Sequence, residues 1–375
     1  MVRIINILKK NWKKAVGASD RDYVASPAPE PELSPLPSAQ MDAPLTGTNP
    51  YRRKPSVAEA AAEARAIRER LERFHALYRN LHAMVCLALG GVIHRDKVEE
   101  TIGQVADAFE AEPFNELLLL FYSFSRKNYL TAHIVNDVIL TVGFARSLGY
   151  ERREMLDLGI SAFAHDLGMA HFEGIARKGQ QLTAQEIEDI KQHPMRSSEM
   201  VRPIFAEKIA SAVLDVHERE NGQGYPRGIP GAEIHLWAKI IAVCDTFEAL
   251  THPRIFRSPY SPYEAMKIII KKKDVLFDDT VVKRFIDFMS IYPVGTLVYL
   301  NSGELALVTG SNYGSPTRAV VRVLINENRE IEEGNQVIDL ARQDFVYISG
   351  VVEPEKEKEI LYFLKPRGQV ELDDV

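Results

Sequence analysis

The chain has 375 residues, a formal net charge of -6 and 46% hydrophobic residues. This length and composition predict more than one folded unit around a substantial core, and the negative charge argues against a surface built to bind DNA. The cysteines, Cys86 and Cys244, are too few for a disulfide framework, which favours a reducing, cytoplasmic environment.

The first segment, residues 1–18, is basic and amphipathic. Isoleucines and Trp12 are interleaved with lysines, and no uninterrupted apolar core of signal-peptide length occurs. As a helix, residues 1–16 could lie on an anionic membrane surface or dock on a partner; the alternative is a tail that does neither. No run reaches the roughly 20 apolar residues that span a bilayer. Residues 19–56 are rich in Pro, Ala, Ser and Glu, which predicts a disordered linker.

A helical pattern begins at Ser56, where apolar residues start to recur at three- and four-residue spacing. This period predicts a long helix with one apolar face, which could pack on the core or pair with a second copy of the chain in a homodimer. Further helices are expected at about 96–111, 114–126 and 129–148. We assign residues 57–126 to a helical N-terminal region and 127–291 to a mainly helical domain.

The period shortens to two after Pro293. The stretches TLVYL, ELALVTG and RAVVRVLIN predict strands, with Asn301-Ser302-Gly303 as a turn between the first pair. Residues 292–375 are therefore expected to form a small β-rich C-terminal extension. The fold class expected for the whole chain is mostly α, with this β-rich appendage.

The helical domain contains a set of histidine and aspartate residues that could bind metal: His133, His165, Asp166, His193, His217 and Asp245. The adjacent pair His165-Asp166 is informative because a carboxylate can bridge two cations while the imidazole holds one of them. Nitrogen and oxygen donors suit Fe, Mn, Zn or Ni, and such a site usually activates water against a phosphoester.

Asp137 follows His133 by one helical turn, so both lie on one helix face. We expect Asp137 to orient the imidazole as an outer partner; the alternative is a packed core histidine beside an exposed aspartate. Asp166 and Asp245 lie in apolar helices, where an unpaired charge is costly. A bound cation is the simplest partner for both. In the loop after His217, flanked by glycine and proline, we expect Tyr225 to be exposed.

Taken in order, the motifs HDLG at 165–168, HP at 193–194, HERENGQGYP at 217–226 and VCDTFEALT at 243–251 resemble the HD-GYP family of metal-dependent phosphohydrolases. The resemblance covers about residues 127–291. It implies an HD-domain helical bundle that hydrolyses cyclic di-GMP to linear pGpG or GMP. It also implies diguanylate cyclase domains of the GGDEF type as partners.

The resemblance implies two divalent metal ions. The first would be held by His133, His165, Asp166 and Asp245, and the second by Asp166, His193 and His217. Asp166 and His165 would form the catalytic centre, where Asp166 bridges the ions beside a shared water or hydroxide. Arg254 and Arg257 would contact the ligand phosphates, and Tyr225 would contact the nucleotide.

Several positions depart from the family pattern. A histidine is replaced by Val216, a lysine by Met169, a glycine by Ser197, an aspartate by Asn221, and the glutamate of members with three metals by Tyr129. These changes weaken the second metal site and remove a lysine near the phosphate. Two functions therefore stay open: a two-metal phosphodiesterase, and a degenerate receptor or interaction module. A third, an HD-type hydrolase of another phosphoester, is disfavoured by the GYP loop.

Overall fold

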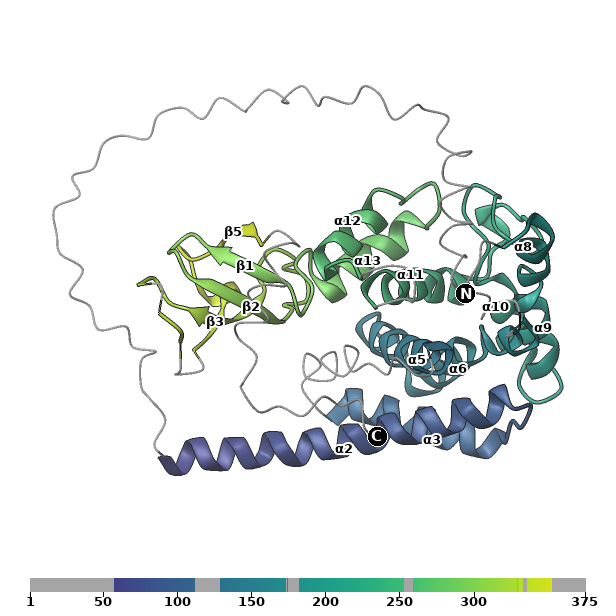
Figure 1. Ribbon diagram of the computed structural model, residues 1–375, viewed down its shortest axis with the longest axis horizontal. Helices are drawn as coiled ribbons and strands as arrows, with labels where there is room; N and C mark the ends of the chain where they lie inside the picture. Colours follow the sequence, from purple (N-terminus) through teal and green to yellow (C-terminus); the bar gives the residue numbers. More distant parts are fainter. Residues whose placement is uncertain are drawn as a thin grey trace, which may run out of the picture.

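The structure is a computed structural model that describes residues 57–111, 129–172, 174, 182–252, 259–328, 330–332 and 336–352. The predicted basic segment, the predicted linker, the predicted helix at 114–126, and Arg254 and Arg257 lie outside these residues. Within the described part, a helical body is followed by a small sheet, as the sequence predicts (Figure 1).

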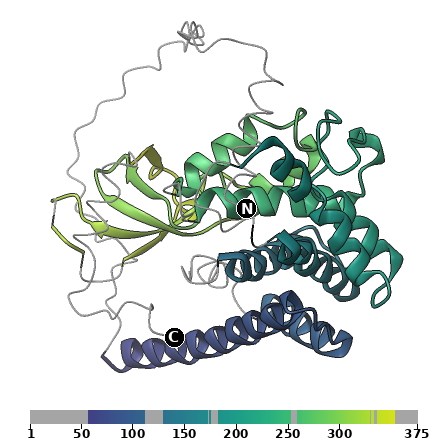
Figure 2. The ribbon, with the colours of Figure 1, turned by 45° about the vertical axis from the view of Figure 1, so that its right-hand side comes forward.

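The helical body consists of α2 (Val57–Leu89), α3 (Arg95–Ala111), α5 (Tyr129–Ser147), α6 (Arg152–Ala164), η1 (Leu167–Phe172), α8 (Ala184–Ile190), α9 (His193–Val201), α10 (Glu207–Asp215), η2 (Gly231–Glu233), α11 (Leu236–Thr251), α12 (Pro262–Ile270) and α13 (Asp279–Met289). Helix α2 is a long rod along one side of this body, with α3 packed beside its C-terminal half (Figures 1 and 2).

Helices α5, α6 and α11 form the centre of the body. Every residue of α5 from Thr131 to Ala145 is buried, and α6 is buried from Met155 to its end. A helix that is apolar on all faces belongs inside a larger core. Gly159 lets α6 pack closely, because a Cβ there would lie 2.6 Å from the side chain of Ile102 and 2.7 Å from that of Val142. Polar side chains on these central helices are therefore enclosed by protein.

The C-terminal sheet is antiparallel and has the strand order β4-β3-β2-β1-β5. Its strands are β1 (Leu297–Leu300), β2 (Leu305–Gly310), β3 (Val320–Ile325), β4 (Val337–Asp339) and β5 (Ile348–Val351), with the short helix η3 (Leu340–Arg342) after β4. The turn between β1 and β2 contains Gly303 at φ 103°, a conformation that favours glycine. Inward-facing residues such as Val298, Ala306 and Val321 give the sheet an apolar core of its own.

The fold class predicted from the sequence is confirmed, and two residues that commonly end helices have other places here. Pro194 does not end a helix: α8 ends at Ile190, and Pro194 lies in the first turn of α9, where a missing N–H costs nothing. Gly168 does not end α6, which stops at Ala164; it lies within η1. No helix among the described residues is long and apolar enough to cross a membrane. The domain boundaries remain predictions.

Candidate metal centre

The six side chains expected to bind metal converge around Asp166. Helix α5 supplies His133, the turn after α6 supplies His165 and Asp166, α9 begins with His193, the turn after α10 holds His217, and α11 holds Asp245. Oδ1 of Asp166 lies 3.0 Å from Nε2 of His193 and 3.5 Å from Nε2 of His217. Its Oδ2 lies 3.5 Å from Nε2 of His133. Asp166 is thus central to the cluster.

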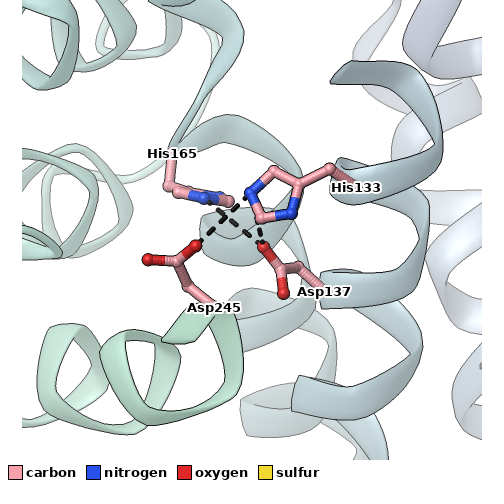
Figure 3. A group of neighbouring side chains, drawn as sticks. All are labelled: His133, Asp137, His165 and Asp245. Atoms are coloured by element: carbon pink, nitrogen blue, oxygen red, sulfur yellow. Dashed lines mark ion pairs between the residues drawn. The ribbon is translucent and has the colours of Figure 1, made fainter. Parts of the chain in front are cut away.

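Asp245 approaches the cluster from α11, on the side opposite α5 (Figure 3). Its Oδ1 lies 3.3 Å from Nε2 of His133, and its Oδ2 lies 3.9 Å from Nδ1 of His217. One carboxylate of α11 therefore contacts histidines from both halves of the predicted ligand set. The separation in sequence between His133 and Asp245 is overcome because α5 and α11 pack together in the core.

Hydrogen bonds on the outer side of the histidines fix how their rings face the cluster. Nδ1 of His165 donates to the carbonyl of Ala162 and Nδ1 of His193 donates to that of Ile190, each over 2.7 Å. A carbonyl oxygen only accepts, so each Nδ1 carries the proton and each Nε2 keeps its lone pair. Those lone pairs face Asp166, as a metal ligand requires.

The buried atoms of the cluster are suited to a divalent metal. Among the described residues, polar atoms without a hydrogen-bond partner include both carboxylate oxygens of Asp137, Oδ1 of Asp166, Nε2 of His165 and His193, and both ring nitrogens of His217. Buried polar atoms are rarely left without partners. Imidazole nitrogens and carboxylate oxygens are the donor types that Fe, Mn, Zn and Ni share. The residues present therefore fit the cations that the sequence implies.

Electrostatics of the cluster depend on burial and on close opposite charges. Burial opposes ionisation of Asp166, but the surrounding imidazoles, His165 first, hold the pKa of this carboxyl well below its usual range. Burial lowers the pKa of His217 to about 4, so this imidazole is neutral at neutral pH. In contrast, burial raises the pKa of the Asp137 carboxyl well above its usual range.

The sequence reasoning misplaced Asp137 and missed Glu248. We expected Asp137 behind His133, but its Oδ2 lies 3.3 Å from Nε2, the nitrogen that faces the cluster. The nitrogen on the outer side, Nδ1, instead contacts the carboxylate of Glu248 on α11. Glu248 also accepts a 3.2 Å hydrogen bond from Asn136. The sequence contained one signal for Glu248: this acidic residue lies three positions after Asp245 on the same apolar helix.

Tyr225 is buried, which corrects the expectation that the loop exposes it. Its exposed fraction is 8%, and its ring stacks on His217 with centroids 5.0 Å apart and planes 14° apart. The loop folds inward because the buried carboxylate of Glu218 accepts hydrogen bonds from the backbone N–H groups of Arg227, Gly228 and Ile229. The hydroxyl of Tyr225 has no partner among the described residues.

The departures from the family pattern are accommodated by local packing. Met169 is 1% exposed and packs with Tyr129, Leu182 and Ile190 in an apolar cluster. Val216 is fully buried in the main core. Both substitutions therefore place apolar side chains where the family pattern has ionisable ones, and these side chains are part of the packed interior.

Comparison with known families agrees with this geometry. Residues 126–281 match the model of the HD domain, and residues 297–360 match that of the KOW domain associated with HD domain. The fold and the buried histidine–aspartate cluster thus define an HD-domain protein.

Relatives make the assignment more specific. A cyclic di-GMP phosphodiesterase of Pseudomonas aeruginosa is 29% identical over 259 residues, which are 68% of this chain and 62% of that protein. The cyclic di-GMP phosphodiesterase PdeB of Borreliella burgdorferi is 26% identical over 211 residues, 56% of each chain. The 3'3'-cGAMP-specific phosphodiesterase 1 of Vibrio cholerae is 35% identical over 127 residues, 33% of this chain and 30% of that one. The chain spans less than two thirds of each of these proteins. The HD-domain match and these relatives confirm the resemblance of the motifs to the HD-GYP family.

Proposed function

We propose that this protein is a metal-dependent phosphodiesterase that hydrolyses cyclic dinucleotides, with cyclic di-GMP as its substrate and linear pGpG or GMP as its product. The observation that supports it is the convergence of four histidines and the carboxylates of Asp166 and Asp245 in one buried cluster. The relatives whose names specify cyclic di-GMP support the substrate.

The proposed ligands divide into two sets that share Asp166. His133, His165, Asp166 and Asp245 would hold one divalent cation, and Asp166, His193 and His217 would hold the other. When bound, such cations supply Lewis acidity that activates water against a phosphodiester and neutralises charge on the phosphate. Fe, Mn, Ni and Zn all suit this donor set.

The side chains around these ligands orient them and receive the nucleotide. Glu248 holds the proton of His133 on Nδ1, so that Nε2 faces the cluster. Tyr225 stacks on His217, and its buried hydroxyl, which has no partner among the described residues, would contact the nucleotide. Arg254 and Arg257, which lie outside the described residues, remain our proposed contacts to the substrate phosphates, because guanidinium groups suit phosphate oxygens.

Met169 motivates a second candidate function, a receptor that binds cyclic dinucleotide without cleaving it. The lysine of the family pattern is absent, and Met169 is enclosed in an apolar cluster. General acid help to a leaving oxygen is typically worth about 10²–10⁴-fold, so turnover would be slower than in members with the lysine. A GGDEF-type partner, a homodimer and membrane contact through residues 1–16 remain predictions from the sequence.

The deciding experiment incubates purified full-length protein, loaded with Mn²⁺ or Fe²⁺, with cyclic di-GMP and separately with 3'3'-cGAMP. Chromatography of the products measures linear dinucleotide. The phosphodiesterase proposal expects linear product from cyclic di-GMP and loss of that product in an Asp166→Asn variant. Tight cyclic di-GMP binding by calorimetry without product from either metal form would establish the receptor instead. Product from 3'3'-cGAMP alone would overturn the substrate proposal.

A further inference from the structure

Asp137 lies on the side of His133 that faces the cluster. It follows His133 by one turn of α5 and is fully buried. Its Oδ2 lies 3.3 Å from Nε2 of His133 and 3.5 Å from Nε2 of His165. Nε2 of His133 also lies 3.3 Å from Oδ1 of Asp245, and Nε2 of His165 lies 3.6 Å from Oδ1 of Asp166. The side chains of His133, Asp137, His165 and Asp245 point toward one another in Figure 3. Asp137 therefore faces the space that a metal ion would occupy.

The ring nitrogen of His133 that faces away from the cluster, Nδ1, already has a partner in Glu248. A metal-binding histidine uses one ring nitrogen for the ion and donates its other N–H to an outer partner. Glu248 contacts Nδ1 of His133 and fills that outer role. Asp137 approaches Nε2, whose lone pair is required for the ion. Asp137 consequently cannot orient His133 from behind while this histidine binds metal.

The Asp137 carboxylate also lacks other partners among the described residues. Neither of its oxygens accepts a hydrogen bond from any described residue, and no lysine or arginine among those residues forms an ion pair with it. Asp157 on α6 is equally buried, yet it pairs with Lys208 at 2.6 Å and with Arg153 at 3.3 Å. Asp157 is thus stabilised by cationic side chains, whereas Asp137 has no such partner among the described residues.

The dimensions of the cluster suit coordination of one ion by all four side chains. One donor atom from each of His133, Asp137, His165 and Asp245 lies within 4.8 Å of the others. Donors bound at about 2.0–2.2 Å can be up to about 4.4 Å apart on opposite sides of one ion. Side-chain adjustments of a few tenths of an ångström would therefore bring all four into one coordination shell.

We propose that Asp137 is a direct ligand of the first metal ion, beside His133, His165, Asp245 and the shared Asp166. This inference rests on the metal centre proposed above, but it does not depend on turnover. Three carboxylates and two neutral imidazoles make this site harder and more negatively charged than the second set. The first site thus holds its ion tightly and favours Mn²⁺ or Fe²⁺, while the second, with three protein ligands, exchanges its ion more readily.

The test compares Asp137→Asn with Asp157→Asn in the full-length chain. Both variants neutralise an aspartate of equal burial while keeping its shape, and circular dichroism checks that they are folded. Bound manganese per chain after gel filtration and the Mn²⁺ dissociation constant are measured. The melting temperature is recorded with and without Mn²⁺.

A ligand role for Asp137 has a specific signature. Asp137→Asn weakens Mn²⁺ binding at the tighter site by at least about 10-fold, the lower bound seen when only an outer partner of a ligand is lost. Its metal-free melting temperature does not fall, and the rise on adding Mn²⁺ shrinks, because weaker binding stabilises less. Asp157→Asn lowers the melting temperature of both forms and leaves Mn²⁺ affinity unchanged.

Two outcomes would overturn the inference. Unchanged Mn²⁺ affinity in Asp137→Asn would show that the carboxylate is not a ligand. A fall in its metal-free melting temperature without a change in affinity would show a purely structural role. If wild-type protein bound no divalent cation, the proposed metal centre itself would fail. Metal binding without hydrolysis would reject only the proposed activity.

Discussion

The backbone N–H of Gly168 donates a 2.8 Å hydrogen bond to the hydroxyl of Ser197. Gly168 follows the His165-Asp166 pair, and Ser197 lies in α9, which begins with His193. A Cβ on Gly168 would lie 2.8 Å from the backbone nitrogen of Ser197, so the two segments approach closely only with glycine here. The serine that replaces the family's glycine thus joins the segment of His165-Asp166 to the helix that begins with His193.

Replacing Ser197 with Ala or Gly tests this link. Either change leaves the buried Gly168 N–H without its acceptor, which typically costs about 1–3 kcal/mol. We expect a lower melting temperature and weaker Mn²⁺ binding in both variants, even though Ser197→Gly restores the family pattern. Ser211→Ala, which removes only a contact to Glu207 at the surface, serves as the control. A stable Ser197→Gly variant with normal metal affinity would contradict the argument.

Glu248 contacts Nδ1 of His133, a ligand of the proposed first metal site. Because the carboxylate holds the proton on Nδ1, we expect Glu248→Gln to weaken Mn²⁺ binding by about 10–100-fold, as for other outer partners of ligands. Calorimetric titration with Mn²⁺ measures the effect. Glu188→Gln, at a surface ion pair with Lys191, should leave the affinity unchanged. Equal Mn²⁺ affinities in Glu248→Gln and Glu188→Gln would show that Glu248 does not support metal binding.

We proposed above that the Tyr225 hydroxyl contacts the substrate, while its ring stacks on His217. Burial raises the pKa of this phenol above its usual range, so the group stays neutral and can donate. Tyr225→Phe keeps the ring, and we expect unchanged metal content with substrate affinity lower by about 2- to 10-fold, the effect of one hydrogen bond. Equilibrium binding of cyclic di-GMP provides the measurement. A loss of metal, with normal nucleotide affinity, would assign the hydroxyl to the metal centre instead.

Asp278 supplies a pH-dependent contribution to stability at the start of α13. It accepts backbone hydrogen bonds of 2.9 Å from Thr280 and 3.1 Å from Val281, and a 3.1 Å bond from Lys239. Partial burial opposes its ionisation, yet these bonds hold its pKa below the usual range. Asp278→Ala should lower the free energy of unfolding by about 0.5–2 kcal/mol at pH 7.

The sign of the pH effect follows from the lowered pKa. Below about pH 4, the unfolded carboxyl, with a pKa of about 3.9, binds protons before the folded one does. The stabilisation by Asp278 is therefore complete above that pH and is lost as the pH falls through the lower folded pKa. Urea unfolding should show the same difference between wild type and Asp278→Ala from pH 7 to about pH 5, and a smaller difference as the pH falls below about 4. A difference that does not shrink below about pH 4 would refute this assignment.

Periodicity predicted the architecture well because burial imposes regular patterns. The apolar run around His133 lies in a helix that is buried from Thr131 to Ala145, and the segments of alternating residues after Pro293 form antiparallel strands. Local errors occurred where tertiary contacts decide. In the sequence, Pro194 is equally compatible with the end of one helix and the beginning of the next. The structure places it in the first turn of α9, because α8 has already ended at Ile190.

The residues of the site were predictable as a set because the motifs specify them, and the structure brings the six together. Their metal binding remains a prediction. The spacing of one helical turn places Asp137 and His133 on the same face of the helix. It does not fix the rotation of the imidazole ring, so it could not predict that Asp137 would approach Nε2 and not Nδ1. Tyr225 appeared exposed because loops usually are. The carboxylate of Glu218, which draws that loop inward, is not distinguishable in sequence from a solvated one.

The most direct test of the shared role of Asp166 is the number of Mn²⁺ ions bound per chain in wild-type protein and in Asp166→Ala. If this carboxylate bridges both sites, wild type binds about two ions, and the variant loses both sites together while remaining folded. A variant that keeps either ion at wild-type affinity would contradict the bridged centre on which the proposed function depends.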